Sequence, residues 1–145
     1  MDFGFSGEQE QLQAGVRRFL DQECPLDRVR TIMATKEGFD AGLWEKTAGL
    51  GWQALTIPEE YGGAGFTYVE LVVVLEEMGA ALLCAPFFST VALGANALLT
   101  SGDTQAMERL LPGIAAGETI ATLALTEDSG RWDADGVTLA ATPSG

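Results

Sequence analysis

Two groups of side chains in this sequence are of types that contact ligands. Ser89, Thr90 and Leu93 follow Pro86 on an expected helix, where small residues either line a ligand slot or allow helices to pack closely. Thr126 ends a β-rich run and stands before a loop that contains glycine. A hydroxyl beside free backbone amides at a strand end suits the polar edge of a cofactor. For both groups, plain packing or solvent exposure remains the alternative.

Residue type and spacing exclude or weaken several other kinds of chemistry. The sequence contains no histidine, which removes serine–histidine and cysteine–histidine nucleophile pairs and most zinc sites. The glycine-rich turn at residues 62–65 lacks the lysine and the spacing of a phosphate-binding loop. Four carboxylates lack the spacing of an EF-hand calcium loop, so we expect them to be solvated and to hold no metal: Glu127, Asp128, Asp133 and Asp135.

The charge of the chain is strongly negative. Its 145 residues carry a formal net charge of −13, which argues against nucleic acid and anionic membranes as partners. If the protein handles a phosphorylated ligand, most of the basic residues that hold the phosphates must lie elsewhere. Cys24 and Cys84 have no paired spacing, so we expect two free thiols in a reducing cytoplasm, with a disulfide as the unsupported alternative.

One long uncharged stretch has to be weighed as a membrane span. No charged residue stands between Glu77 and Asp103, but Pro86 interrupts the stretch and its flanks are acidic rather than basic. We expect two buried helices that meet near Pro86 instead. The first residues lack positive charge and a long apolar run, so we expect no secretory signal and a cytoplasmic location.

The chain is organised around an apolar helix that follows the turn at residues 58–67. Thr67 and Glu70 have the spacing of a capping box, which predicts that the helix begins there. Apolar residues follow at helical intervals up to Leu82. A helix this apolar is expected to be central, with neighbours on several sides.

Flanking segments predict further helices. Ser6 and Gln9 form a second capping box, and that helix is expected to end before Pro25. Residues 52–57 are expected to form a short extended link. Two further helices are predicted over residues 27–35 and 88–99. Asp40 is expected to cap a helix that ends at residues 49–51. Asp103 is expected to cap another helix, which ends or kinks at Pro112.

The hydrophobic pattern changes after residue 117. Residues 119–126 are β-rich, Asp135-Gly136 is a hairpin-type turn signal, and residues 137–140 are the candidate return strand. We therefore predict a mainly α fold: an orthogonal or up-down bundle of about six helices over residues 1–117, followed by the first strands of a β domain over residues 118–145. A lone hairpin is marginal in water, so we expect this β domain to be incomplete here.

Four segments together resemble the acyl-CoA dehydrogenase family. Each is weak alone, but their order and spacing are fairly specific, and they cover the chain from residue 3 to about residue 130. The predicted order of helices before strands agrees independently. The four segments are Phe3-Gly4-Phe5-Ser6-Gly7-Glu8-Gln9, Ile57-Pro58-Glu59-Glu60-Tyr61-Gly62-Gly63-Ala64-Gly65, Arg109-Leu110-Leu111-Pro112-Gly113-Ile114-Ala115-Ala116-Gly117-Glu118 and Ala124-Leu125-Thr126-Glu127.

The resemblance implies a three-part enzyme with an N-terminal helical domain, a middle β domain and a C-terminal four-helix bundle. In this family a glutamate of the C-terminal domain removes the α proton of an acyl-CoA thioester, and a hydride passes from the β carbon to FAD. The product is the trans-2-enoyl thioester. That glutamate would lie beyond Gly145, so we expect no catalytic residue in this chain.

The resemblance also assigns roles to the two groups of ligand-type side chains. The Leu-Thr-Glu segment touches the flavin ring in the family, which makes Leu125 and Thr126 the expected FAD-binding residues. The helix after Pro86 lines the acyl pocket in the family. The expected substrate-binding residues are therefore Ser89, Thr90 and Leu93.

Two alternatives to a complete dehydrogenase remain open. Residues 128–133 lack the proline and the Gly-Ser-Asp group common in the family, and some divergent members act in heteromeric pairs in which one partner has lost catalytic residues. The first alternative is a non-catalytic partner subunit or helical interaction module, and the second is a flavin oxidase or monooxygenase on the same scaffold. The resemblance further implies an electron-accepting flavoprotein as partner and a homo- or hetero-oligomer.

Overall fold

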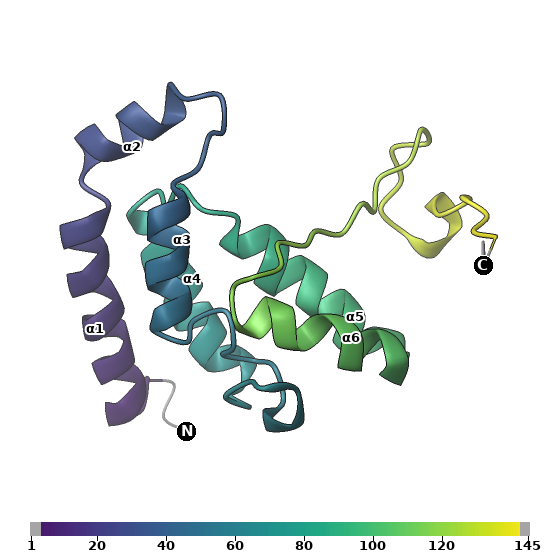
Figure 1. Ribbon diagram of the computed structural model, residues 1–145, viewed down its shortest axis with the longest axis horizontal. Coiled ribbons are helices and arrows are strands. Elements are labelled where there is room, and N and C mark those ends of the chain that lie inside the picture. Colours follow the sequence, from purple (N-terminus) through teal and green to yellow (C-terminus); the bar gives the residue numbers. More distant parts are fainter. Residues whose placement is uncertain (1–3, 143–145) are drawn as a thin grey trace.

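The computed structural model describes residues 4–142. Phe3 of the opening motif and residues 143–145 of the predicted β region lie outside this range. Figure 1 shows the helices gathered in one body, from which the chain after α6 leads away to the C-terminal loop. In chain order the elements are α1 Gly7–Glu23, α2 Leu26–Met33, α3 Ala41–Gly49, the 3-10 turn η1 Glu59–Tyr61, α4 Tyr68–Ala80, the π-helix η2 Phe88–Ala95, α5 Asn96–Ser101, α6 Thr104–Ala115 and the 3-10 turn η3 Ala134–Gly136.

Side-chain caps begin four helices where the sequence predicts them. A cap works because the first main-chain N–H groups of a helix have no partner within it. Both predicted capping boxes form, at the starts of α1 and α4. The side chain of Ser6 accepts the main-chain N–H of Gln9, and Asp40 accepts that of Leu43. Thr67 accepts the N–H of Val69, and Asp103 accepts that of Ala106.

The main apolar cluster forms where α4 packs along α1. α4 contributes Leu71, Val74 and Met78 to it, and α1 contributes Val16 and Leu20. A second cluster lies between the end of η2 and α6. One face of α4 stays open, since Val69 and Val72 are 46% and 55% exposed.

Residues 52–57 do not form the extended link that we expected. Consecutive turns fold this segment, with N–H groups of Ala54, Leu55 and Ile57 each bonded three residues back. The compact path lets the segment serve both clusters, since Trp52 and Leu55 pack in the first and Ile57 in the second. An extended link would have exposed one of these faces.

The uncharged stretch contains the end of α4 and, after a loop through Pro86, a second helical run whose first part is unusual. Residues 88–95 form a π-helix instead of the start of a regular α-helix, and α5 continues from it. α6 runs through Pro112 and ends only at Ala115, so the proline does not end the helix. Among residues 4–142, no helix combines the length and apolar character needed to cross a bilayer.

The predicted β strands are absent from the described residues. Residues 119–126 are extended but pair with no other strand, and Asp135-Gly136 lies in η3 instead of a hairpin turn. The carboxylate of Glu127 accepts the N–H groups of Thr138 and Leu139 in place of a strand partner. Main-chain groups need a partner or water, and a two-stranded hairpin is marginal by itself. The division at residue 117 into two domains remains a prediction.

Candidate functional site

The predicted substrate residues lie on η2, where the π-helix follows Pro86. Ser89 is half-buried, and its hydroxyl donates to the carbonyl oxygen of Pro86 at 3.1 Å. Leu93 is also half-buried. Thr90 is completely buried. Ser89 and Leu93 therefore retain surface that a ligand can contact, whereas Thr90 does not. π-helical turns are frequent at functional sites, which makes η2 a reasonable place for one.

An apolar groove of about 360 Å³ lies beside η2, where the loop from α4 enters it. Phe88 stands at its edge and is 59% exposed. The groove is not lined by the three predicted substrate residues, and sequence reasoning did not single out the residues that do line it. The lining residues carry only packing signals: those as far as Leu82 belong to the helically spaced apolar positions of the expected central helix, and the rest belong to the apolar run around Pro86. The lining residues are Leu75, Met78, Gly79, Leu82, Leu83, Ala85, Phe87 and Phe88.

The predicted cofactor residues lie on the extended segment after α6. Leu125 is 38% exposed, and Thr126 is exposed. Within the described residues, Thr126 makes no hydrogen bond through its hydroxyl or its main chain. The segment therefore presents free donors and acceptors together with an apolar side chain, which suits a flat polar ring system.

The structure joins these two groups only indirectly. Thr90 bonds to Ala121 at the start of the extended segment, while Leu125 and Thr126 lie further along it. In Figure 1 the segment leads away from the helices past η2 and α5. No hydrogen bond among the described residues links Ser89 or Leu93 to Leu125 or Thr126.

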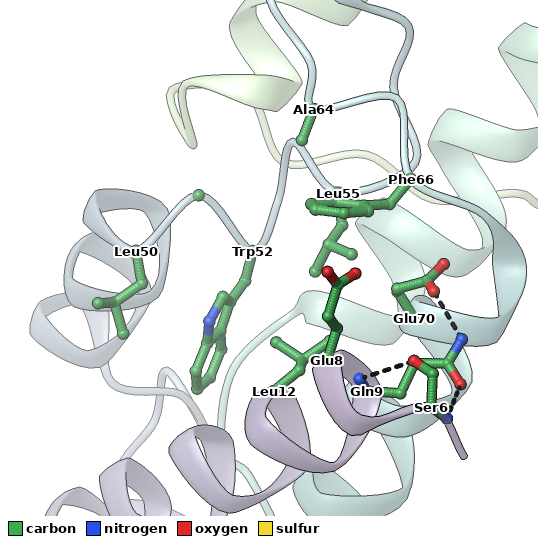
Figure 2. A pocket seen from close by; sticks show the side chains of 11 residues that line it. Ser6, Glu8, Gln9, Leu12, Leu50, Trp52, Leu55, Ala64, Phe66 and Glu70 are labelled. Carbon is green, nitrogen blue, oxygen red and sulfur yellow. Dashed lines mark hydrogen bonds between the residues drawn. The ribbon is translucent and has the colours of Figure 1, made fainter. Parts of the chain in front are cut away.

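A separate pocket of about 450 Å³ opens between the starts of α1 and α4 (Figure 2). Trp52, Leu55 and Phe66 form apolar walls, and Glu8 and Glu70 bring carboxylates to it. The pocket therefore combines apolar walls with negatively charged side chains. Sequence reasoning missed this pocket, because its walls come from three segments that are far apart along the chain.

Glu70 links the two capping boxes beside this pocket. Its carboxylate accepts from Thr67 in its own capping box and from the side-chain amide of Gln9 at 2.8 Å. Hydrogen bonds from Thr67 first, and then from Gln9, favour the ionised form and lower the pKa of Glu70 to about 2. The carboxylate is thus charged throughout the physiological range.

Most of the basic side chains elsewhere are paired with carboxylates. Arg17 binds Glu77, Arg28 and Lys46 share Glu23, and Arg131 binds Asp133 and Asp135. No group of carboxylates, cysteines or histidines in residues 4–142 is arranged to hold a metal ion. Cys24 and Cys84 are both free thiols. Among the described basic side chains, those without an ion pair are Arg18, Lys36 and Arg109.

Comparison with known proteins settles the family. The sequence profile of the acyl-CoA dehydrogenase N-terminal domain matches residues 6–118. The chain belongs to the acyl-CoA dehydrogenase family. It is 37% identical over 116 residues to the acyl-CoA dehydrogenase IpdE2 of Mycolicibacterium smegmatis, covering 79% of this chain and 37% of that protein.

Solved structures of other proteins have the same helical fold. The ChsE4-ChsE5 complex of Mycobacterium tuberculosis contains a chain that superimposes with a TM-score of 0.81 and 30% identity, over 90% of this chain and 36% of that one. An acyl-CoA dehydrogenase complexed with FAD from Bacillus anthracis gives a TM-score of 0.73 and 25% identity, over 86% of this chain and 21% of that one. The chain therefore spans between about a fifth and little more than a third of the length of these proteins.

Proposed function

We propose that this chain is the helical part of an FAD-dependent acyl-CoA dehydrogenase. One observation carries the proposal beyond family membership. The chain combines an apolar groove, the half-buried face of η2 beside it, and an extended segment with free main-chain groups whose start is bonded to η2. An acyl chain needs an apolar wall, and a flavin needs a polar edge. These features supply one of each.

For the cofactor, we propose contacts from Leu125 and Thr126. Both are exposed, and the unpaired hydroxyl and main chain of Thr126 fit the nitrogen and oxygen atoms at a flavin edge. When bound, FAD supplies the hydride acceptor of the reaction. Leu125 would pack against the ring and exclude water, and Thr126 would orient it by hydrogen bonds.

For the substrate, we propose that η2 forms part of the wall around the acyl chain. Ser89 and Leu93 have surface available for this contact. Thr90 was expected beside them, but it is completely buried, which indicates a different contribution. We propose no catalytic base within this chain, and we propose that most phosphate-binding charges lie outside it.

For partners and assembly, we propose an oligomer with an electron-accepting flavoprotein as its redox partner. The exposed apolar side chains of α4 and of the extended segment support further contacts with protein. A cytoplasmic location is part of the same proposal. The heteromeric alternative is favoured by one observation, since a similar chain belongs to the ChsE4-ChsE5 complex. The oxidase alternative has no comparable support.

The test is flavin retention and reduction by the full purified protein. We expect it to retain FAD, and we expect the oxidised flavin absorption to bleach when an acyl-CoA is added without oxygen. Thr126→Ala should weaken FAD binding about tenfold. Thr122→Ala is the matched control, because Thr122 is an exposed threonine of the same segment. A protein that takes up no added FAD contradicts the proposal.

Acceptor and composition assays separate the alternatives. A dehydrogenase passes electrons from an acyl-CoA to an artificial acceptor and consumes little oxygen, whereas an oxidase or monooxygenase consumes oxygen in proportion to product. A non-catalytic partner subunit would be inactive alone and would co-purify with a second, catalytically complete chain.

A further inference from the structure

The main chain of Ala121 is held by a side chain instead of a neighbouring strand. Oγ1 of Thr90 donates to the carbonyl oxygen of Ala121 and accepts from its N–H, both at 3.2 Å. A hydroxyl can make both bonds because it has one donor and two acceptor lone pairs. One threonine of η2 thus supplies the pair of bonds that residues of adjacent antiparallel strands exchange.

Close packing on both sides reinforces this contact. A Cβ at Gly94, on the same π-helix as Thr90, would lie 2.7 Å from the Cβ of Ala121. A Cβ at Gly113 of α6 would lie 2.6 Å from Oγ1 of Thr119. Real Cβ atoms essentially never approach so closely, so Gly94 is needed for the segment to lie where it does. At Gly113 the near atom is a side-chain hydroxyl, and the carbonyl oxygen of Gly113 also accepts the N–H of Thr119 at 3.0 Å. The start of the segment is therefore fixed at Thr119 and Ala121.

Beyond Ala121 the segment has no comparable support. Residues 122–126 are all exposed, and none of them makes a hydrogen bond within the described part of the chain. The direction in which they leave the helices is consequently set at Ala121. The bonds at Ala121 are therefore the last described restraint before Leu125 and Thr126, and losing them would widen the range of positions that these two residues occupy.

We propose that Thr90 is a positioning residue for the cofactor edge. Its hydroxyl fixes the segment at Ala121 and so aims Leu125 and Thr126 relative to η2. The inference rests on the proposed flavin-binding function. It assigns Thr90 to the main chain of the segment instead of to the acyl chain, which its complete burial supports.

Two substitutions at Thr90 in the full protein separate hydrogen bonding from shape. Thr90→Val keeps the side-chain shape and removes both hydrogen bonds, while Thr90→Ser keeps the hydroxyl and removes one methyl group. We expect Thr90→Val to speed amide hydrogen exchange at Ala121 about tenfold and to weaken FAD binding by a similar factor. Thr90→Ser should restore both quantities to near their wild-type values.

A substitution at Gly94 tests the same contact if Thr90→Val fails to fold. Gly94→Ala leaves both hydrogen-bonding groups in place but pushes on the Cβ of Ala121, and it should raise exchange in the same residues. Circular dichroism identifies any variant that has lost its helices. If Thr90→Val has lost its helices, the exchange and FAD-binding data of Gly94→Ala decide instead.

The outcomes separate this inference from the proposed function. Unchanged exchange at Ala121 in a folded Thr90→Val protein overturns the inference, and so does faster exchange with unchanged FAD affinity. A wild-type protein that binds no FAD overturns the proposed function together with the cofactor half of the inference. Even then, exchange at Ala121 decides whether Thr90 holds the segment.

Discussion

Glu77 carries a buried carboxylate, and an exposed arginine neutralises its charge. Its side chain is 6% exposed, and Arg17, which is 61% exposed, donates to both carboxylate oxygens at 2.8 and 2.6 Å. The bonds from Arg17 are the main reason that the pKa of Glu77 lies below its usual value. The pair connects α1 to α4.

Removing the arginine should leave this carboxylate without its counter-charge. We expect Arg17→Met to lower the free energy of unfolding, because it leaves the 6% exposed carboxylate of Glu77 without two of its hydrogen bonds. Denaturant unfolding at neutral pH measures it. Arg18→Met is the matched control, since Arg18 is exposed on the same helix and has no ion pair among the described residues. Equal losses in both variants would contradict the expectation.

The lowered pKa of Glu70 predicts how its contribution to stability depends on pH. A carboxylate with a folded-state pKa of about 2, against an ordinary value of 4.5, stabilises the fold above pH 4.5. That contribution is lost as the pH falls towards 2. The difference in unfolding free energy between wild type and Glu70→Gln should therefore be full at neutral pH and shrink on acidification.

Unfolding curves at several pH values test this prediction. Glu8→Gln serves as the control, because Glu8 lines the same pocket but makes no hydrogen bond or ion pair within the described residues. It should change the unfolding free energy little. A gap for Glu70→Gln that widens as the pH falls would show that its ionised form does not stabilise the fold.

At the scale of elements, the end of α6 is fixed against α3 by one glycine. The indole N–H of Trp44 donates to the carbonyl oxygen of Gly117 at 2.7 Å. Gly117 has φ +76, and a Cβ there would lie 2.5 Å from the Cβ of Ala48. Both its backbone conformation and the space around it require glycine.

Alanine substitutions at Gly102 and Gly117 separate the cost of backbone strain from the cost of overpacking. Gly102 has a similar φ of +72 but open space where a Cβ would be, so Gly102→Ala should cost only the backbone strain of about 1–2 kcal/mol. Gly117→Ala should cost more, roughly 2–4 kcal/mol, because overpacking adds to the strain. Thermal unfolding of the two variants provides the comparison. Equal costs would mean that α3 moves aside freely.

Local signals explain which elements the sequence predicts well. The caps Ser6, Asp40, Thr67 and Asp103 are recognisable because each acts on main-chain groups within three residues. The π-helical form of η2 and the continuation of α6 through Pro112 depend on packing, and no short sequence motif predicts them. The predicted strands need partners, and Glu127 takes that role for Thr138 and Leu139.

The candidate site was predictable only in part, for the same reason. Family resemblance directs attention to Thr90 and Thr126. However, a threonine that touches a ligand and one that binds a main chain are identical in sequence. The partner of Thr90 is Ala121, which is 31 positions away, and only the folded chain brings the two together. The pocket beside Glu70 likewise appears only after α1, α4 and residues 50–55 have packed.

At the scale of the whole molecule, repulsion between like charges should oppose folding. The chain has 21 acidic and 8 basic side chains, and most of the basic ones are already paired. Salt shortens the range of charge interactions, from about 10 Å at 0.1 M to about 3 Å at 1 M. We therefore expect the melting temperature to rise with sodium chloride. A fall would mean that weakening of the ion pairs outweighs relief of the repulsion.

The contacts between α1 and α4 also fix the direction in which the two helices run. Gln9 meets Glu70 near their starts, and Arg17 meets Glu77 further along, so the helices are parallel. Each helix carries a macrodipole with about half a positive elementary charge at its N-terminus. Parallel packing brings these like ends together. The carboxylate of Glu70 lies beside both ends, and Glu8 and Glu10 stand in the first turn of α1, so acidic side chains offset both like ends.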